Sequence, residues 1–280
     1  MTLAYLNPWH RPSSDFDPTP FLALLFRAPV KLLLYHTYHF VTYLRSAPPP
    51  PQRPPVRVVC ISDTHNLILE NVPEGDLLIH AGDMTNDGSV VEIQKQIDCT
   101  PLLAAEQHQR RIRIYGAPQI PACGPTNVHA FQYERGRDAW SKTVPDDIDI
   151  LITHTPPKFQ LDLPLPKGLG CEHLLAEVTR VKPKLHVFGH VHWGAGQTVV
   201  WWDKAHEAYV QGSSIQSRWT RGLLNPRLWW NVVRVAYRGI RALLWDRVWG
   251  GQSPNTIMVN AAQTHGNTGK LGNAIQVVDI

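Results

Sequence analysis

The chain lacks the features that mark small secreted, repetitive or nucleic-acid-binding proteins. Its 280 residues include only four cysteines, they are widely spaced, and no C-x-x-C pair occurs: Cys60, Cys99, Cys123 and Cys171. This pattern favours neither a disulfide framework nor a zinc knuckle, so we interpret the four as reduced thiols of a cytoplasmic protein. No internal repeat and no nucleic-acid-binding motif is visible, and we expect no nucleic acid partner.

Charge of either sign is also scarce, whereas apolar residues are plentiful. Charged residues make up 18% of the chain and hydrophobic residues 43%, which is typical of a globular protein with a full core and not of a disordered one. The length permits one large domain or two small ones. The net charge of +4 favours anionic partners without identifying any.

An apolar segment occupies residues 21–44, and its length would permit a membrane span. Arg27, Pro29 and Lys31 interrupt it, and a basic side chain at the bilayer centre costs about 2.5–3.5 kcal/mol. The segment also lacks the basic start and small-residue cleavage site of a secretory signal. We therefore expect a helix that packs on the domain or lies in a membrane interface.

A proline-rich stretch at residues 47–55 follows this segment and predicts an extended linker. We place the main domain boundary there. Residues 1–46 are then an apolar N-terminal segment, and residues 56–280 form the main domain with a basic, tryptophan-rich insertion at about 218–250.

Strand and helix patterns alternate after residue 56. Apolar runs predict strands at 56–61, 76–80, 111–115, 148–153, 185–188, 197–202, 257–259 and 274–278. Ser89 and Glu92 form a capping-box pattern that predicts a helix to about Ile97, and a second predicted helix at 171–181 ends before Pro183. The alternation predicts an α/β fold with a mixed sheet and helices outside it.

The insertion is rich in arginine and tryptophan. Residues 218–249 hold seven arginines and five tryptophans but one acid, Asp246. Arg234, Arg238 and Arg241 recur at helical spacing and share one face. Two interpretations stay open: an aromatic face packed on the domain with solvated arginines, or peripheral contact with an anionic membrane.

Six side chains of metal-binding types follow four of the predicted strands. They are Asp63 and His65, Asp83 after Gly82, His154, and His190 and His192 after Gly189. Residues two apart beyond a strand end can point the same way, and α/β sheets gather ligands at such ends. Carboxylates and imidazoles together bind borderline ions such as Mn²⁺, Fe²⁺ and Zn²⁺. The sequence therefore predicts a metal site.

A single histidine beside a strand is more often a structural hydrogen-bonding residue than a ligand. Four other histidines are candidates for that structural role: His80, His129, His173 and His186.

The ordered motifs resemble the calcineurin-like metallophosphoesterase superfamily. Within it, the UPF0046-like branch of small fungal and animal proteins shares the patterns S-D-T-H, H-A-G-D, T-H-x-P-P and G-H-x-H, found here at 62–65, 80–83, 153–157 and 189–192. The resemblance covers about residues 56–215 and the last strand. It implies a four-layer α/β/β/α sandwich with mixed sheets.

The same resemblance implies a hydrolase with two divalent metal ions. Residues matching Asp63, His65 and His192 hold one ion. Those matching His154 and His190 hold the second, and Asp83 bridges both. A metal-activated water would attack a small phosphodiester or phosphomonoester such as a cyclic nucleotide. This assigns Asp83, His154 and His190 as catalytic residues.

One superfamily motif is missing. Relatives carry G-N-H-[DE], whose Asn binds the second metal and whose His contacts the phosphate, but residues 88–115 contain no such tetrapeptide. A whole strand–loop segment of the superfamily is missing near residues 98–100. Asn86 and the Asn127-Val-His129 stretch are weak substitutes.

Three explanations of the missing motif stay open. The chain is a mis-spliced or truncated product, a protein with one good and one damaged metal site, or a phosphate- or nucleotide-binding protein without catalysis. We expect reduced metal occupancy at the second site and weak or no turnover.

Overall fold

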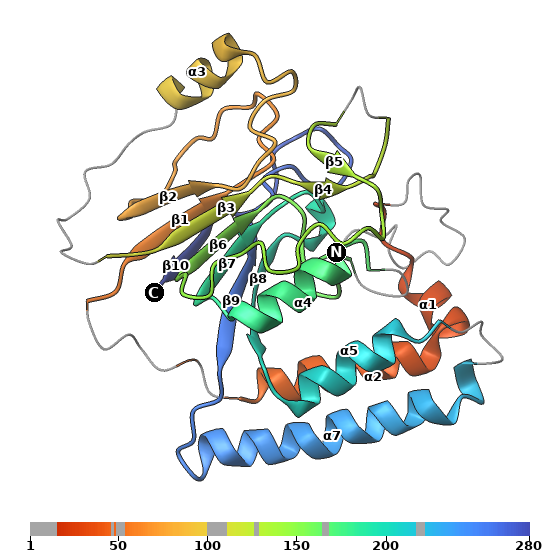
Figure 1. The fold of residues 1–280 in the computed structure, drawn as a ribbon. Helices are drawn as coiled ribbons and strands as arrows, with labels where there is room; N and C mark the ends of the chain where they lie inside the picture. Colours follow the sequence, from red (N-terminus) through yellow and green to blue (C-terminus); the bar gives the residue numbers. More distant parts are fainter. Residues whose placement is uncertain are drawn as a thin grey trace. The chain divides into compact units, whose positions relative to one another are not determined.

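The structure is a computed structural model that describes residues 16–45, 48, 54–99, 111–125, 129–163, 168–216 and 222–280 (Figure 1). The chain divides into two compact units. We call residues 1–48, 163–168 and 199–256 the helical unit, and residues 49–162, 169–198 and 257–280 the sandwich unit. The domain boundaries expected from the sequence stay a prediction.

Two mixed β-sheets dominate the strand-rich part of the chain. The three-stranded sheet has the order β10-β1-β2, built from Gln276–Asp279, Arg57–Ile61 and Leu77–His80. The five-stranded sheet has the order β3-β6-β7-β9-β8, built from Ile114–Ala117, Ile150–Thr153, Leu185–Phe188, Asn255–Asn260 and Gly196–Trp201. Strand β1 is parallel to β2 and antiparallel to β10. In the five-stranded sheet, the neighbouring pairs β3–β6, β6–β7 and β7–β9 are all parallel. A short parallel pair joins β4 (Ile120–Pro121) to β5 (Gln132–Tyr133).

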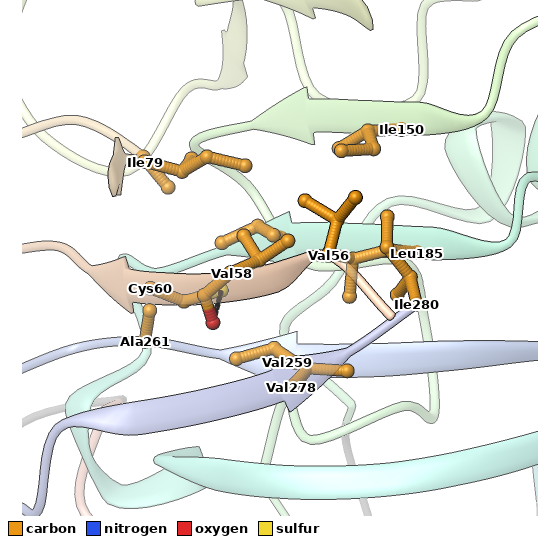
Figure 2. Close-up of a cluster of buried hydrophobic side chains, with 12 residues drawn as sticks. Val56, Val58, Cys60, Ile79, Ile150, Leu185, Val259, Ala261, Val278 and Ile280 are labelled. Carbon is orange, nitrogen blue, oxygen red and sulfur yellow. Dashed lines mark hydrogen bonds between the residues drawn. The ribbon is translucent and has the colours of Figure 1, made fainter. Parts of the chain in front are cut away.

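The core of the sandwich unit lies between the two sheets (Figure 2). Val58 and Cys60 of β1 and Leu185 and Val187 of β7 are each 0% exposed and belong to one apolar cluster. Full burial of such aliphatic side chains contributes roughly 1.5–3 kcal/mol each. Because the sheets pack through this cluster, the loops that follow β1, β2, β6 and β7 meet at one edge.

Two helices of the sandwich unit form where the sequence predicts them. Helix α4 (Glu172–Val181) buries Leu174, Leu175 and Val178 and lies along the five-stranded sheet (Figure 1). Its first turn is capped by Cys171, whose Sγ accepts the Leu174 N–H. Helix α3 (Val90–Cys99) begins as the capping-box pattern predicted, because Ser89 Oγ accepts the Glu92 N–H. The structure therefore confirms a mixed α/β fold with mixed sheets.

Local hydrogen bonds explain where the predicted elements differ from the structure. Strand β3 begins at Ile114 and not at Arg111, because the Arg113 N–H donates to the Asp149 carboxylate and leaves the ladder. Helix α5 (Lys204–Ser214) was not predicted from the sequence. Its signal is Asp203, which accepts the N–H groups of Ala205 and His206 as an N-cap.

The apolar segment at 21–44 forms two helices, α1 (Phe21–Arg27) and α2 (Pro29–Tyr43). The break follows from Pro29, which lacks an N–H and occupies the first helical position. Helix α2 packs against α5 and against α7 (Pro226–Arg247), and Figure 1 shows the three side by side. Tyr38 of α2 stacks on Tyr209 of α5 at 4.2 Å between ring centroids. Among the described residues, no helix is both long and apolar enough to cross a membrane.

A buried guanidinium joins the three helices. Arg45 follows α2, and its side chain is 1% exposed. It lies 2.5 Å from the Asp203 carboxylate and 2.6 Å from that of Asp246 on α7, and it covers the Trp201 ring at 4.3 Å. One cation therefore pairs with two carboxylates that would be costly to bury without a partner.

The α2–α7 contact predicts a stability effect at Gly239. A Cβ there would approach Val41 Cγ1 to 2.5 Å. Although alanine is favoured in helices by about 1 kcal/mol, we expect Gly239→Ala to lower the free energy of unfolding by about 1–3 kcal/mol through overpacking. Chemical denaturation would measure this. The same change made in a Val41→Ala background should cost little, and an equal cost in both backgrounds would contradict the proposed clash.

Candidate metal centre

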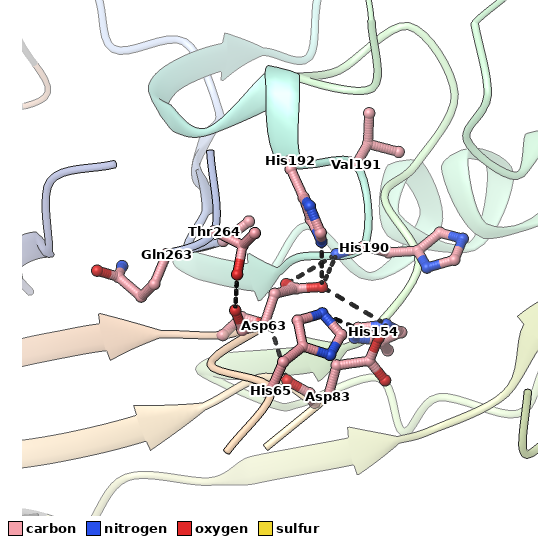
Figure 3. A network of polar contacts seen from close by, with 12 residues as sticks. Asp63, His65, Asp83, His154, His190, Val191, His192, Gln263 and Thr264 are labelled. Atoms are coloured by element: carbon pink, nitrogen blue, oxygen red, sulfur yellow. Dashed lines mark hydrogen bonds and ion pairs between the residues drawn. The ribbon is translucent and has the colours of Figure 1, made fainter. Parts of the chain in front are cut away.

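All six predicted side chains meet at one edge of the sandwich unit (Figure 3). Asp63 and His65 follow β1, and Asp83 follows β2, so the three-stranded sheet provides two carboxylates and one imidazole. His154 follows β6, and His190 and His192 follow β7, so the five-stranded sheet provides three imidazoles. Neither sheet alone carries the complete set.

The side chains form two groups suited to holding a metal ion. Asp63, His65 and His192 make one group, and Asp83, His154 and His190 make the other; the potential ligand atoms within each group all lie within 4.8 Å of one another. The groups adjoin. His154 Nε2 lies 3.3 Å from Asp83 Oδ2 and 4.0 Å from Asp63 Oδ1, and His65 Nε2 lies 3.9 Å from Asp83 Oδ2.

Asp63 is the buried centre of the site, with a side chain that is 0% exposed. Its carboxylate accepts the His190 backbone N–H at 3.0 Å and contacts His192 Nε2 at 3.2 Å, while its carbonyl accepts the Thr264 hydroxyl at 2.7 Å. Burial alone would raise its pKa. The bond from His192 and the charge of His154 instead hold the pKa of Asp63 well below its usual range.

Backbone carbonyls fix the orientation of two imidazoles. Nδ1 of His192 lies 2.7 Å from the Gly266 carbonyl, and Nδ1 of His154 lies 3.0 Å from the Ala81 carbonyl. An imidazole that donates Nδ1–H to a carbonyl presents Nε2 as its ligand atom. In both residues Nε2 faces the carboxylates, as a metal ligand would require.

The carboxylates create a strongly negative local field. Burial disfavours the charged form of His154, yet the bond to Asp83 and the charge of Asp63 raise its pKa to about 9. A field that attracts protons to imidazoles also attracts divalent cations, and ligands must lose those protons when a metal binds. The pKa of His190 is lowered to about 3 by burial and by the charge of His154, so His190 is held as the neutral ligand form.

The site concentrates unusual backbone conformation. Four of the six ligand candidates have positive φ angles: Asp63 (54°), His65 (46°), Asp83 (49°) and His190 (67°). L-residues rarely adopt this region, at a cost of roughly 1–3 kcal/mol each for a strained residue. Such clustering is typical of functional sites, where surrounding contacts hold side chains in position.

Two glycines permit the ligands to approach one another. Gly82 has a φ of +116°, and a Cβ there would lie 2.5 Å from His154 Nδ1. A Cβ on Gly189 would lie 2.1 Å from Asp63 Oδ2 and 2.2 Å from Ser62 Oγ. The Gly-Asp and Gly-His pairs of the sequence are therefore required by close packing and not only by turn geometry.

A supporting loop was missed by sequence reasoning. Residues 261–273 carry Thr264 and Gly266, and they are held by Asn273, whose Nδ2 donates to the carbonyls of His192, Ala262 and Thr264 at 3.2, 3.0 and 2.8 Å. The only local signal was a polar, glycine-rich stretch after β9. Which residues of this loop contact the site depends on the tertiary fold.

Three of the four histidines assigned structural roles do make such contacts. His80 Nε2 lies 3.0 Å from the Thr64 hydroxyl, His186 Nε2 lies 2.9 Å from the Thr153 hydroxyl, and His173 Nε2 lies 3.1 Å from the Gly136 carbonyl. Of the two weak substitutes for the missing asparagine, Asn86 is exposed, and Asn127 lies outside the described residues.

The donor set fits divalent cations. It combines carboxylate oxygens with imidazole nitrogens, which suits borderline metals. In two of the imidazoles, the ring nitrogen that would not bind the metal is held by a backbone carbonyl. The assignment of these residues as ligands, and of Asp83 as a bridging ligand, stays a prediction.

The contact at Gly189 predicts a defect in metal binding. A Cβ there would displace Asp63, so we expect Gly189→Ala to weaken Mn²⁺ binding by about 10- to 100-fold, as measured by titration calorimetry. Gly116→Ala is the matched control, because its Cβ would meet no atom within 4 Å. Equal Mn²⁺ affinity of the two variants would show that Asp63 does not depend on this packing.

The chain is similar to several curated proteins. The chain is 34% identical over 258 residues to a probable rhamnogalacturonate lyase C of Emericella nidulans, covering 75% of this chain but 23% of that protein. It is 32% identical over 203 residues to a UPF0046 protein of Caenorhabditis elegans, covering 51% of this chain and 71% of that protein. It is also 32% identical over 215 residues to Metallophosphoesterase domain-containing protein 1 of Homo sapiens, covering 54% and 64%.

No family model matches the chain. Two of the relatives above are nevertheless more than 30% identical to the chain over more than half of its length. The chain therefore belongs to the UPF0046 family of metallophosphoesterase-like proteins.

Proposed function

We propose that the protein is a metal-dependent phosphoesterase that hydrolyses small phosphodiesters or phosphomonoesters such as cyclic nucleotides. The observation that carries this proposal is the pair of adjoining Asp/His groups at one edge of the sandwich unit. Metallophosphoesterase-named relatives support the reaction class. The substrate class is inferred from the family.

All six residues would hold the metal ions, and three of them are also assigned as catalytic. Asp63, His65 and His192 would hold one divalent ion and His154 and His190 the second, with Asp83 between them. Two such ions, when bound, supply Lewis acidity toward phosphate oxygens and lower the pKa of a coordinated water. In this proposal the catalytic residues are Asp83, His154 and His190.

Exposure indicates the side from which a substrate approaches. The side chains of Asp83 and His65 are 42% and 31% exposed, whereas those of Asp63 and His154 are 0% and 8% exposed. A phosphate would therefore reach the site past Asp83 and His65. The buried residues would act from beneath it by fixing charge and excluding water on that side.

Protonation of the leaving group is the weak point of the site. In the superfamily that the motifs resemble, the histidine of G-N-H-[DE] is expected to serve this step, and the sequence between residues 88 and 115 lacks it. The four imidazoles brought together here are all assigned to metal binding in the proposal. Without a dedicated acid, the leaving oxygen would take its proton from water, and turnover would be slow for poor leaving groups.

Hydrolysis of bis-p-nitrophenyl phosphate tests the proposal, because its good leaving group needs little acid assistance. We expect Mn²⁺-dependent turnover that falls about 100-fold or more in Asp83→Asn. Asp279→Asn is the matched control, since this carboxylate lies on β10, pairs with Arg57 and is 48% exposed. Turnover that persists in Asp83→Asn, or that needs no metal, would contradict the assignment.

A second candidate function is phosphate or nucleotide binding without catalysis. The missing motif favours it, because the Asn that would complete the second ion's ligands is also lost. Calorimetry of cyclic nucleotides with the Mn²⁺-loaded protein discriminates the two functions. Binding without turnover of either the nucleotide or the p-nitrophenyl ester would select the binding function.

A further inference from the structure

Helix α7 has two apolar faces, and only one is covered. Its buried face contains Leu228, Val232, Val235 and Gly239, which lie toward α2 and α5. The opposite face carries an outer stripe of five exposed side chains: Trp230 (62%), Val233 (53%), Tyr237 (59%), Ile240 (51%) and Leu244 (38%). Their spacing of three and four residues keeps them on one side of the helix.

The exposed tryptophans argue against one of the two interpretations left open by the sequence. An aromatic face packed on the domain would bury them, yet Trp229, Trp230, Trp245 and Trp249 are 42%, 62%, 53% and 64% exposed. The packing interpretation is therefore wrong for these four residues. A contiguous patch of large, exposed apolar side chains is typical of a binding surface.

The charge beside the outer stripe has one sign. Arg227, Arg234, Arg238 and Arg241 lie along one flank, and residues 226–245 contain no acid. The sole acid of the helix, Asp246, is 5% exposed and is paired with Arg45. The flank of α7 that carries these four arginines is therefore basic, and no acid of residues 226–245 offsets it.

We propose that the outer stripe of α7 docks the protein on an anionic membrane surface. The helix has 22 residues and a length of about 33 Å, and it would lie parallel to the bilayer. Its apolar side chains would enter the headgroup boundary, while the arginines contact lipid phosphates and carboxylates. Exposed tryptophans near both ends suit the interface, where amphipathic rings accumulate.

Charge complementarity favours lipid over a second copy of this chain. Pairing two outer stripes would bring arginine-lined flanks together, and residues 226–245 offer no carboxylate to neutralise them. Anionic headgroups supply that charge and attract basic side chains that lie near the membrane surface. Because salt screens this attraction, docking should weaken as the salt concentration rises.

Vesicle sedimentation with the full chain tests the proposal. We expect binding to phosphatidylcholine vesicles that contain about a third phosphatidylserine, and little binding to phosphatidylcholine alone. Arg227→Glu with Arg241→Glu should lower the partition coefficient by about tenfold or more. Tyr237→Ser with Ile240→Ser should also lower it, because apolar insertion is lost.

Matched controls come from exposed residues elsewhere. Lys95→Glu with Lys204→Glu makes the same change in net charge, and Val90→Ser with Val91→Ser removes side chains that are 82% and 79% exposed on α3. Both controls should bind as the parent does. Equal binding to neutral vesicles, no binding at low salt, or equal loss in the controls would overturn the proposal.

Sedimentation velocity gives the remaining outcome. If the parent dimerises and the Tyr237→Ser, Ile240→Ser variant is monomeric without any vesicle binding by the parent, the outer stripe is an interface between copies and not a membrane surface. Hydrolysis of bis-p-nitrophenyl phosphate should be the same in all these variants as in the parent, because no residue changed here belongs to the candidate metal centre. Failure of membrane docking and failure of the proposed phosphoesterase function can therefore be told apart.

Discussion

The buried carboxylate of Asp63 is the constraint on which the candidate site depends. An ionised group without solvent contact must be compensated by hydrogen bonds or by cations. Here the compensation comes from the His190 backbone N–H and the His192 ring, and both belong to the loop after β7. That loop can approach closely because position 189 is glycine. The need to neutralise one carboxylate thus fixes the loop that carries two further ligands.

The sandwich converts this local constraint into an assembled site. Asp63, His65 and Asp83 belong to loops of one sheet, and His154, His190 and His192 to loops of the other, so the site exists only when the apolar faces of both sheets are packed. Four positive φ angles show that loop conformation is held against its local preference. The free energy for this comes from the core between the sheets, since apolar burial is the dominant favourable term of folding. Stability and ligand geometry therefore share one source.

The sequence predicted those features that have a local signal. Strand ends followed by Asp63, Asp83 or His154 were identified because apolar runs stop directly before them, and Ser89 with Glu92 marked the start of α3. The carbonyl partners at Ala81 and Gly266 could not be predicted, because any residue has a carbonyl and only the fold selects which one faces an imidazole. The pairing of α2 with α5 and α7 likewise has no local signal. Amphipathicity alone favours an aromatic face that packs on the domain. Helix α7 instead exposes aromatic side chains, because it is apolar on two opposite sides and only one of them is covered.

The helical unit combines segments from distant parts of the chain, and this has a consequence for its synthesis on the ribosome. Helix α2 ends at Tyr43, whereas its partners α5 and α7 begin at Lys204 and Pro226. At translation rates of about 5–20 residues per second, α2 waits roughly 10–40 seconds before the last of α7 is made. Until α5 and α7 are made, Val30, Leu34 and Tyr38, which are later buried, lack the two helices that pack against α2 in the folded protein. The nascent N-terminal segment therefore presents apolar surface of the kind that chaperones shield, and it does so until the chain reaches Arg247.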